Sequence, residues 1–261
     1  MRRDGDLLPA PDRRRHGKDR PPSHRIDQKC ARRQKNTRRP TEHPALNRAP
    51  CFSTFSTVPL PPYRGDPGVA TQSKYPAVVP GAPGAGLNAG AIATQAWANA
   101  SFGPRGLDLL EQDVGAIDTL ERLIESDAGR QSRQVGVVDL DGTAAAFTGE
   151  ECQEWAGHVT GAGYVCLGNI LAGEEVVAAM AETFEAPGEE DFAAKLLTAL
   201  TAGQEAGGDQ RGMQSAALLV AREGGSCGST SDFLVDLRVD DHADPIEELK
   251  RLYLLHGRLN P

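Results

Sequence analysis

The glycine-rich stretch 207–212 carries an acid and a base two residues apart, directly before a predicted strand. Arg211 could hold a substrate carboxylate through two parallel hydrogen bonds while Asp209 orients an amine. Alternatively, the two side chains could pair with each other and tie down a tight loop. Gln214, where the next strand begins, would belong to the same substrate clamp. The glycines are spaced too irregularly for a phosphate-binding loop.

Asn169 follows a predicted strand and stands beside the flexible Gly168. An amide at such a position can donate a hydrogen bond to an oxyanion, and loss of one such donor typically raises a barrier by about 2.7 to 4 kcal/mol. The other interpretation is a turn asparagine that caps the helix beginning near Glu174.

Polar side chains also cluster around the end of the predicted strand 91–98. Thr94, Gln95 and Asn99 could line a substrate pocket, although buried side-chain hydrogen bonding would explain them equally well. His158 is a candidate acid or base because the unperturbed pKa of histidine is near 6.5. A structural or surface histidine is the alternative for this residue.

No metal ion or cofactor is predicted. The five cysteines form no CxxC pair. Residues 240–242 read Asp-Asp-His, but three adjacent residues on an extended segment cannot all face one ion. We expect instead a strand-to-helix connection in which Asp244 caps the last helix.

These residues must be positioned by a mixture of strands and helices. Strands are predicted over 68–75, 91–98, 134–140, 143–147, 164–168, 214–221 and 233–239. Apolar residues at helical spacing predict helices around 117–124, 177–184, 192–200 and 246–253. Such grouped runs favour an α+β fold with antiparallel sheets and outer helices over strict βαβ alternation. Seven prolines within 57–90 argue against a well-paired sheet in the middle of that stretch.

Composition separates a basic extension from an acidic body. Residues 1–50 hold 15 Lys and Arg against 6 Asp and Glu, a net charge of +9 that leaves −17 for the remainder of the −8 total. Residues 1–53 are predicted to be disordered because they lack apolar periodicity. Nucleic-acid binding is disfavoured because no aromatic residue interleaves with the charges. No apolar run approaches the roughly 20 residues of a membrane span, so a cytoplasmic protein is expected.

A series of short motifs resembles one family, the Ntn-hydrolase-like domain-of-unknown-function family 1028 (DUF1028). The matching stretches include 54–56 (TFS), 72–74 (QSK), 93–96 (ATQA), 102–107 (FGPRGL), 133–136 (RQVG), 168–173 (GNILAG), 207–209 (GGD) and 236–242 (DLRVDDH). The resemblance implies a four-layer αββα sandwich over residues 54–261. It also implies amide hydrolysis by an amino-terminal Thr, Ser or Cys, as in N-terminal nucleophile (Ntn) hydrolases.

The resemblance places the nucleophile at Thr54. In such an enzyme the nucleophile's own α-amine is the general base, since its pKa of about 7.7 to 8 leaves it partly neutral at physiological pH. The 53 preceding residues must therefore be absent from the active protein, and the full-length chain should be inactive. Thr54 lies 19 positions before Ser73, a separation suited to a strand, a turn and a returning strand. Lys74 would then lower the pKa of the hydroxyl, unless it is a surface residue at a strand end.

Residues 57–90 depart from the family, because a Pro/Gly-rich sequence replaces its apolar hairpin. Paired frame errors in the coding sequence would produce this departure, and so would pseudogene decay. The predicted function is hydrolysis of a small amide or peptide-like substrate by Thr54, assisted by Lys74, Asn169 and Asp209. The alternative is a non-catalytic ligand-binding or assembly protein with the same fold, and self-association into a homo-oligomer stays open.

Overall fold

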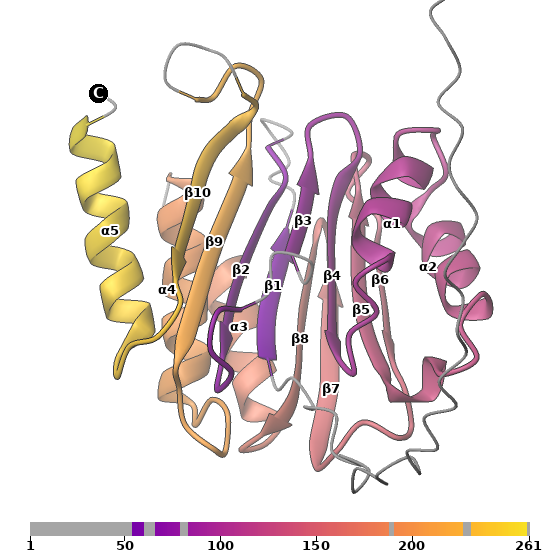
Figure 1. Ribbon diagram of the computed structural model, residues 1–261, viewed down its shortest axis with the longest axis horizontal. Helices are drawn as coiled ribbons and strands as arrows, with labels where there is room; N and C mark the ends of the chain where they lie inside the picture. The colour runs from indigo at the N-terminus through magenta and orange to yellow at the C-terminus, as the bar shows by residue number, and fades with distance from the viewer. Residues whose placement is uncertain (1–53, 60–65, 79–82, 188–190, 227–230, 260–261) are drawn as a thin grey trace, which may run out of the picture. The chain divides into compact units, whose positions relative to one another are not determined.

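The computed structural model describes residues 54–59, 66–78, 83–187, 191–226 and 231–259, which form two antiparallel sheets and their covering helices (Figure 1). The strands are β1 (Thr54–Pro59), β2 (Gly68–Ser73), β3 (Pro83–Gly86), β4 (Gly90–Ala96), β5 (Arg133–Asp139), β6 (Ala144–Thr148), β7 (Trp155–Gly161), β8 (Tyr164–Leu171), β9 (Ser215–Ala221) and β10 (Phe233–Val239). The helices are α1 (Phe102–Leu110), α2 (Ala116–Glu125), α3 (Glu175–Glu185), α4 (Phe192–Glu205) and α5 (Pro245–Leu259), with a short 3-10 turn at Arg130–Ser132. The predicted mixed fold with antiparallel sheets is confirmed. The predicted disorder of residues 1–53 lies outside the described residues.

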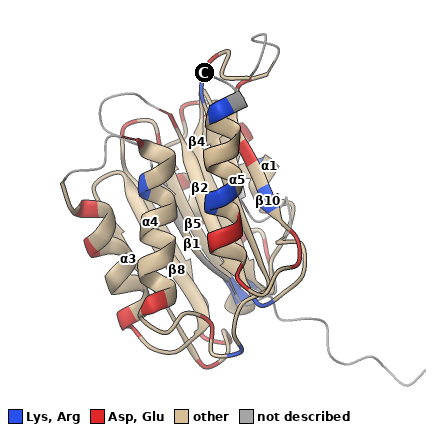
Figure 2. Cartoon of the chain, turned by 90° about the vertical axis from the view of Figure 1, so that its left-hand side faces the viewer, with Lys and Arg blue, Asp and Glu red and all other residues tan. Residues whose placement is uncertain are grey.

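The two sheets pack face to face. The six-stranded sheet has the order β10-β9-β2-β1-β8-β7 and the four-stranded sheet the order β3-β4-β5-β6. Strands β5 and β8 contact each other across the interface, as do β6 and β7, and β1 and β4. Helices α1 and α2 pack on the outer face of the smaller sheet (Figure 1). Helices α3, α4 and α5 pack on the outer face of the larger sheet (Figure 2). None of the described helices combines the length and the apolarity that a bilayer crossing requires.

Three apolar clusters hold these layers together. One joins the six-stranded sheet to its helices through residues such as Met180, Leu196 and Leu249, and a second joins the four-stranded sheet to α1 and α2. The third lies between the sheets, and we call it the inter-sheet apolar cluster: Val58, Val69, Ala91, Ala93, Val138, Val165 and Leu167. Every residue of β2 and of β4 is buried, because each strand is covered on both faces.

Local sequence signals explain two helix starts. Asp191 accepts hydrogen bonds from the main-chain N–H groups of Ala193 and Ala194, which α4 cannot satisfy internally. Asp244 accepts one from the N–H of Glu247, so the predicted cap of the last helix is confirmed.

Two strands were not predicted. β3 contains Pro83 within the proline-rich stretch, and it forms because it is an edge strand whose outer side needs no N–H donor. β7 carries glycines, a histidine and a threonine in place of an apolar alternation, since it is also an edge strand and is only partly buried. The sequence pattern of a strand is weakest at such edges.

Candidate functional site

The predicted nucleophile begins a strand that lies inside the six-stranded sheet. Thr54 is in register with Ser73 of β2, and Phe55 is in register with Gly168 of β8. The predicted strand and its returning partner are thus confirmed, and most of the connection between them lies outside the described residues. The main chain of Thr54 lies between the end of β2 and the end of β8. Strand β1 starts at the lower end of the sheets in Figure 1. The side chain of Thr54 lies outside the described part of the structure.

Lys74 directly follows the partner of Thr54 and contacts the glycine-rich loop. Its main-chain N–H donates to Oδ2 of Asp209 at 3.3 Å, and its Nζ donates to the carbonyl oxygen of Met213 at 3.2 Å. The ammonium group is therefore held at the same end of the sheet as Thr54.

The glycine-rich loop is closed by its own acid and base. The Asp209 side chain is fully buried and accepts from the N–H, Nε and Nη2 of Arg211 at 2.8, 3.2 and 3.1 Å. Gly207, Gly208 and Gly212 have φ angles of +121°, +55° and +102°, which only glycine adopts freely. Asp209 is thus engaged in holding the loop, as the structural alternative predicted, whereas 38% of the Arg211 side chain is exposed.

Asn169 is a strand residue and not a helix cap. It is fully buried in β8, and its Nδ2 donates to Oε1 of Gln134 at 3.3 Å. Helix α3 begins after Glu174 without any side-chain cap, so the capping interpretation of Asn169 is wrong. The amide lies between the sheets, next along β8 from the residue paired with Phe55.

A strained bulge follows Asn169. Ala156 pairs with Asn169 and Trp155 with Leu171, so Ile170 is an extra residue on β8. Its φ of +54° is rare for a β-branched side chain and costs on the order of 1 to 3 kcal/mol. The bulge binds the glycine-rich loop, because the N–H of Gln210 donates to the Ile170 carbonyl at 3.0 Å.

Polar side chains fill the space between the sheets at this end and continue to the exposed edge strand β7 through Thr148 and His158. We call them the inter-sheet polar network: Ser56, Thr71, Gln95, Gln134, Thr148, His158 and Asn169. Ser56 Oγ donates to Gln95 Oε1 at 2.9 Å, and Gln95 Nε2 donates to Gln134 Oε1 at 2.7 Å. Ser56 and Gln134 were quoted among the family motifs but not predicted as site residues. Polar residues at inward positions of buried strands were the signal that would have found them.

Gln134 is the hub of the network. Its Nε2 lies 2.8 Å from the carbonyl oxygen of Gly168, 3.0 Å from that of Gly157 and 2.9 Å from Oγ1 of Thr148. Its Oε1 accepts from the amides of Gln95 and Asn169. One side chain thus contacts β4, β6, β7 and β8.

The remaining predicted substrate-binding residues do not all converge. Thr94 is buried and precedes Gln95 in β4, so the two side chains face opposite sides of the sheet. Gln214 donates to Oδ1 of Asp241 at 3.1 Å, close to the glycine-rich loop. His158 lies on the edge strand β7, where its Nδ1 is 2.9 Å from Oγ1 of Thr148, and partial burial lowers its pKa.

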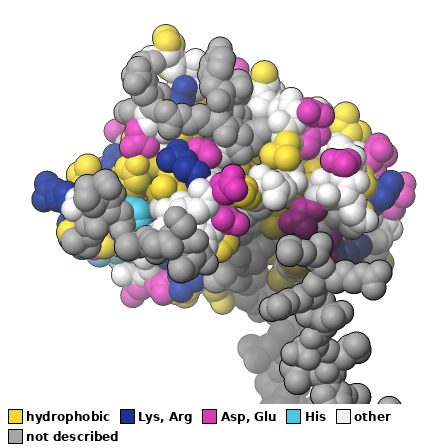
Figure 3. All heavy atoms as spheres, turned by 90° about the horizontal axis from the view of Figure 1, so that it is seen from above, with side chains coloured by type: hydrophobic (Ala, Val, Ile, Leu, Met, Phe, Trp, Pro, Cys, Tyr) yellow, Lys and Arg dark blue, Asp and Glu magenta, His cyan; other side chains and the backbone are white. Residues whose placement is uncertain are grey.

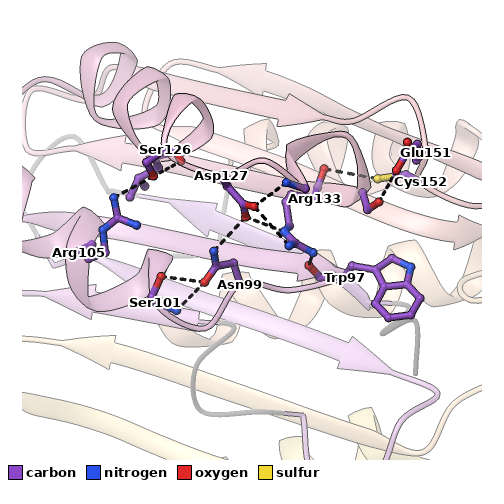
Figure 4. Close-up of polar contacts among 12 residues, drawn as sticks. Trp97, Asn99, Ser101, Arg105, Ser126, Asp127, Arg133, Glu151 and Cys152 are labelled. Atoms are coloured by element: carbon purple, nitrogen blue, oxygen red, sulfur yellow. Dashed lines mark hydrogen bonds and ion pairs between the residues drawn. The ribbon is translucent and has the colours of Figure 1, made fainter. Parts of the chain in front are cut away.

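Asn99 belongs to a separate cluster at the same end of the four-stranded sheet (Figure 4). Its Nδ2 donates to Oδ2 of Asp127 at 2.9 Å, and Nε of Arg133 donates to the same oxygen at 2.8 Å. The hydrogen bond from Arg133 is the main cause that lowers the pKa of Asp127 to about 2. Arg133 also donates to the carbonyl oxygen of Trp97, so the cluster fastens the end of β4 to the start of β5.

The two ends of the sheets therefore differ in character. At the end with Thr54, hydrogen-bond donors and acceptors surround the start of β1. At the opposite end, viewed in Figure 3, acidic, basic and apolar side chains are interspersed over the coloured surface. There Arg222 pairs with the nearly buried Asp66, with its Nη2 at 2.6 Å from Oδ2.

Comparison with known proteins identifies a solved structure and a family that resemble this chain. The chain matches the crystal structure of a protein from Silicibacter pomeroyi, of the DUF1028 family, with a TM-score of 0.70 and 35% sequence identity. That match covers 78% of this chain and 88% of the other. No curated protein matches the chain. The sequence profile of the family of unknown function DUF1028 matches residues 54–249, and the chain therefore belongs to this family.

Proposed function

We propose that this protein is an N-terminal nucleophile amidohydrolase that uses Thr54 to cleave a small amide or peptide-like substrate. The observation that carries the proposal is the position of Thr54, at the start of an inner strand with Lys74 beside it and Asn169 on the neighbouring strand. The order of layers, with helices outside two facing sheets, supports assignment to the four-layer Ntn sandwich. The family match beginning at residue 54 supports the same assignment.

The reaction follows from the chemistry of a free threonine. The α-amine of Thr54 takes the proton of the hydroxyl, and the oxygen attacks the substrate carbonyl. The C–N bond then breaks, the leaving amine takes the proton from the α-ammonium group, and water hydrolyses the resulting ester. Lys74 stabilises the developing negative charge, and the side-chain amide of Asn169 donates to the same oxyanion.

The test compares a protein that begins at Thr54 with one that retains the residues before it. A β-lactone serves as the substrate, because ring opening transfers its acyl group to the threonine oxygen and adds the whole mass of the lactone. We expect acylation only in the shorter protein, with a rate that rises with pH as the α-amine, of pKa about 7.7 to 8, loses its proton. Intact-mass and peptide mass spectrometry after an acid quench locate the adduct.

Three substitutions complete the test. Thr54→Ser should keep acylation, Thr54→Ala should abolish it, and Lys74→Met should slow it by about 10- to 1,000-fold. Equal acylation of the two proteins of different length would exclude the α-amine as base. Absence of acylation from both proteins would instead favour the alternative of a non-catalytic ligand-binding or assembly protein.

A further inference from the structure

The amide of Gln134 does more than fill space between the sheets. Its Oε1 accepts from Asn169 Nδ2 on one side and from Gln95 Nε2 on the other, at 3.3 and 2.7 Å. Donors therefore lie on the oxygen side of the Gln134 amide, and the carbonyl oxygens of Gly157 and Gly168 lie on its nitrogen side, so its orientation is fixed from both sides. The orientation of the Asn169 amide is fixed in turn by Gln134.

Gln134 also holds the main chain that carries Asn169. Its Nε2 lies 2.8 Å from the carbonyl oxygen of Gly168, the residue directly before Asn169. Directly after Asn169, the bulge at Ile170 is clamped by the N–H of Gln210. The chain is thus held on both sides of Asn169, by Gln134 before it and by the glycine-rich loop after it.

Burial explains why these contacts are rigid. Gln95, Gln134 and Asn169 expose 1% or less of their surface. Hydrogen bonds away from water cannot be exchanged for bonds to solvent, so a buried polar network specifies one arrangement. Apolar residues pack equally well between the same sheets at their other end, so packing alone does not require a glutamine at position 134.

We propose that Gln134 is a positioning residue for the reaction of Thr54. It holds the Asn169 amide, and the end of β8, at the angle needed to donate to the developing oxyanion. This inference rests on the proposed function, but the orientation of Asn169 can be measured without any reaction.

The direct test observes the side-chain NH₂ of Asn169 by NMR, assigned through its loss in Asn169→Asp. Gln134→Met keeps the length of the side chain and removes its hydrogen bonds. We expect hydrogen exchange of the Asn169 amide to become at least 10-fold faster in this variant. Unchanged exchange and chemical shift in folded Gln134→Met would overturn the positioning role.

Gln72→Met is the matched control. Gln72 is also fully buried near the same end of the sheet, but its amide has no hydrogen-bond partner among the described residues. It faces the helices and not the other sheet, since Thr71, next to it in β2, accepts from Ser56. The same chemical change should therefore leave the Asn169 signals as they are.

The catalytic consequence is measured by acylation of Thr54 with the β-lactone. We expect the maximal acylation rate of Gln134→Met to fall by about 10- to 100-fold at unchanged half-saturating lactone concentration, and Gln72→Met to react normally. A normal rate in Gln134→Met would overturn the inference. Absence of acylation in the unsubstituted protein would refute the proposed function, whereas the NMR comparison would still decide whether Gln134 orients Asn169. If Gln134→Met does not fold, Gln134→Asn provides the same comparison with one methylene removed.

Discussion

The space between the two sheets is filled in two different ways. The inter-sheet apolar cluster occupies one end and the inter-sheet polar network the other, although both lie between the same strands. In β1, for example, Val58 belongs to the cluster and Ser56 to the network, and in β5 the same is true of Val138 and Gln134. Strand register and sheet spacing therefore do not decide whether apolar or polar side chains occupy the space between the sheets.

The difference indicates what each end contributes. Burial of an apolar side chain stabilises the fold without demanding one orientation. A buried amide stabilises it only when its donors and acceptors are satisfied, and otherwise costs on the order of 1 to 3 kcal/mol. The apolar end is therefore suited to holding the sheets together. The polar end is suited to fixing the direction of particular groups, and it is the end at which Thr54 begins its strand.

The largest effect on stability is expected from Leu167→Ala in the apolar cluster. Leu167 is fully buried, and its truncation should lower the free energy of unfolding by about 2.7 to 5 kcal/mol through lost transfer energy and a residual cavity. Urea denaturation measures the loss. Ile117→Ala, at a side chain that is 54% exposed on α2, should change stability by no more than about 0.5 kcal/mol. If folded Leu167→Ala is acylated at Thr54 as slowly as Gln134→Met, the apolar end also affects the reaction. The two ends then do not differ in the way proposed.

A smaller and non-additive effect is expected within the polar network. Gln95→Met and Gln134→Met should each lower the free energy of unfolding by about 1 to 3 kcal/mol, because each leaves buried partners unsatisfied. The double variant should cost less than the two single costs together, by about 0.5 to 3 kcal/mol, since it removes both ends of the 2.7 Å bond. Costs that add to within about 0.5 kcal/mol would mean that the two amides act independently.

Most strands of the fold, although not the edge strands β3 and β7, could be predicted because their signals are local. The predicted strand 233–239 coincides with β10, and the predicted hairpin over 134–147 corresponds to β5 and β6. The polar network could not be predicted in this way, because its members lie far apart in the sequence. Thirty-nine positions separate Ser56 from Gln95, and 39 separate Gln95 from Gln134. Their meeting depends on how one sheet is placed over the other.

The candidate site was predictable to the extent that its parts lie at strand ends. Lys74, predicted from the family resemblance, and Asp209, predicted from the glycine-rich loop, meet at the end of β2. Thr94 was grouped with Gln95 although the two-residue period of a strand separates their side chains. Asn99 was grouped with them because it is close in sequence, whereas it contacts Asp127 in the loop after α2. Whether these residues act on a substrate stays a prediction.

The smallest effect on stability is expected at the start of β5, beside the inter-sheet polar network. Arg133, directly before Gln134, pairs with Asp127, whose side chain exposes 11% of its surface and whose pKa is lowered to about 2 (Figure 4). Because the carboxyl is more acidic in the folded chain than at its unfolded value of about 3.9, its stabilising contribution is complete above that value. The contribution is lost as pH falls towards 2. Asp127→Asn should therefore lower the free energy of unfolding by about 1 kcal/mol at pH 6, after allowance for solvent screening.

The difference between Asp127→Asn and the unsubstituted protein should disappear near pH 2, and urea denaturation from pH 6 downwards measures it. If Asp127→Asn also speeds hydrogen exchange of the Asn169 amide, the cluster at the start of β5 acts on the polar network through Arg133 and Gln134. If exchange is unchanged, the polar network is held by its own hydrogen bonds. Arg133 then serves only to join β4 to β5, and the neighbouring Gln134 orients Asn169.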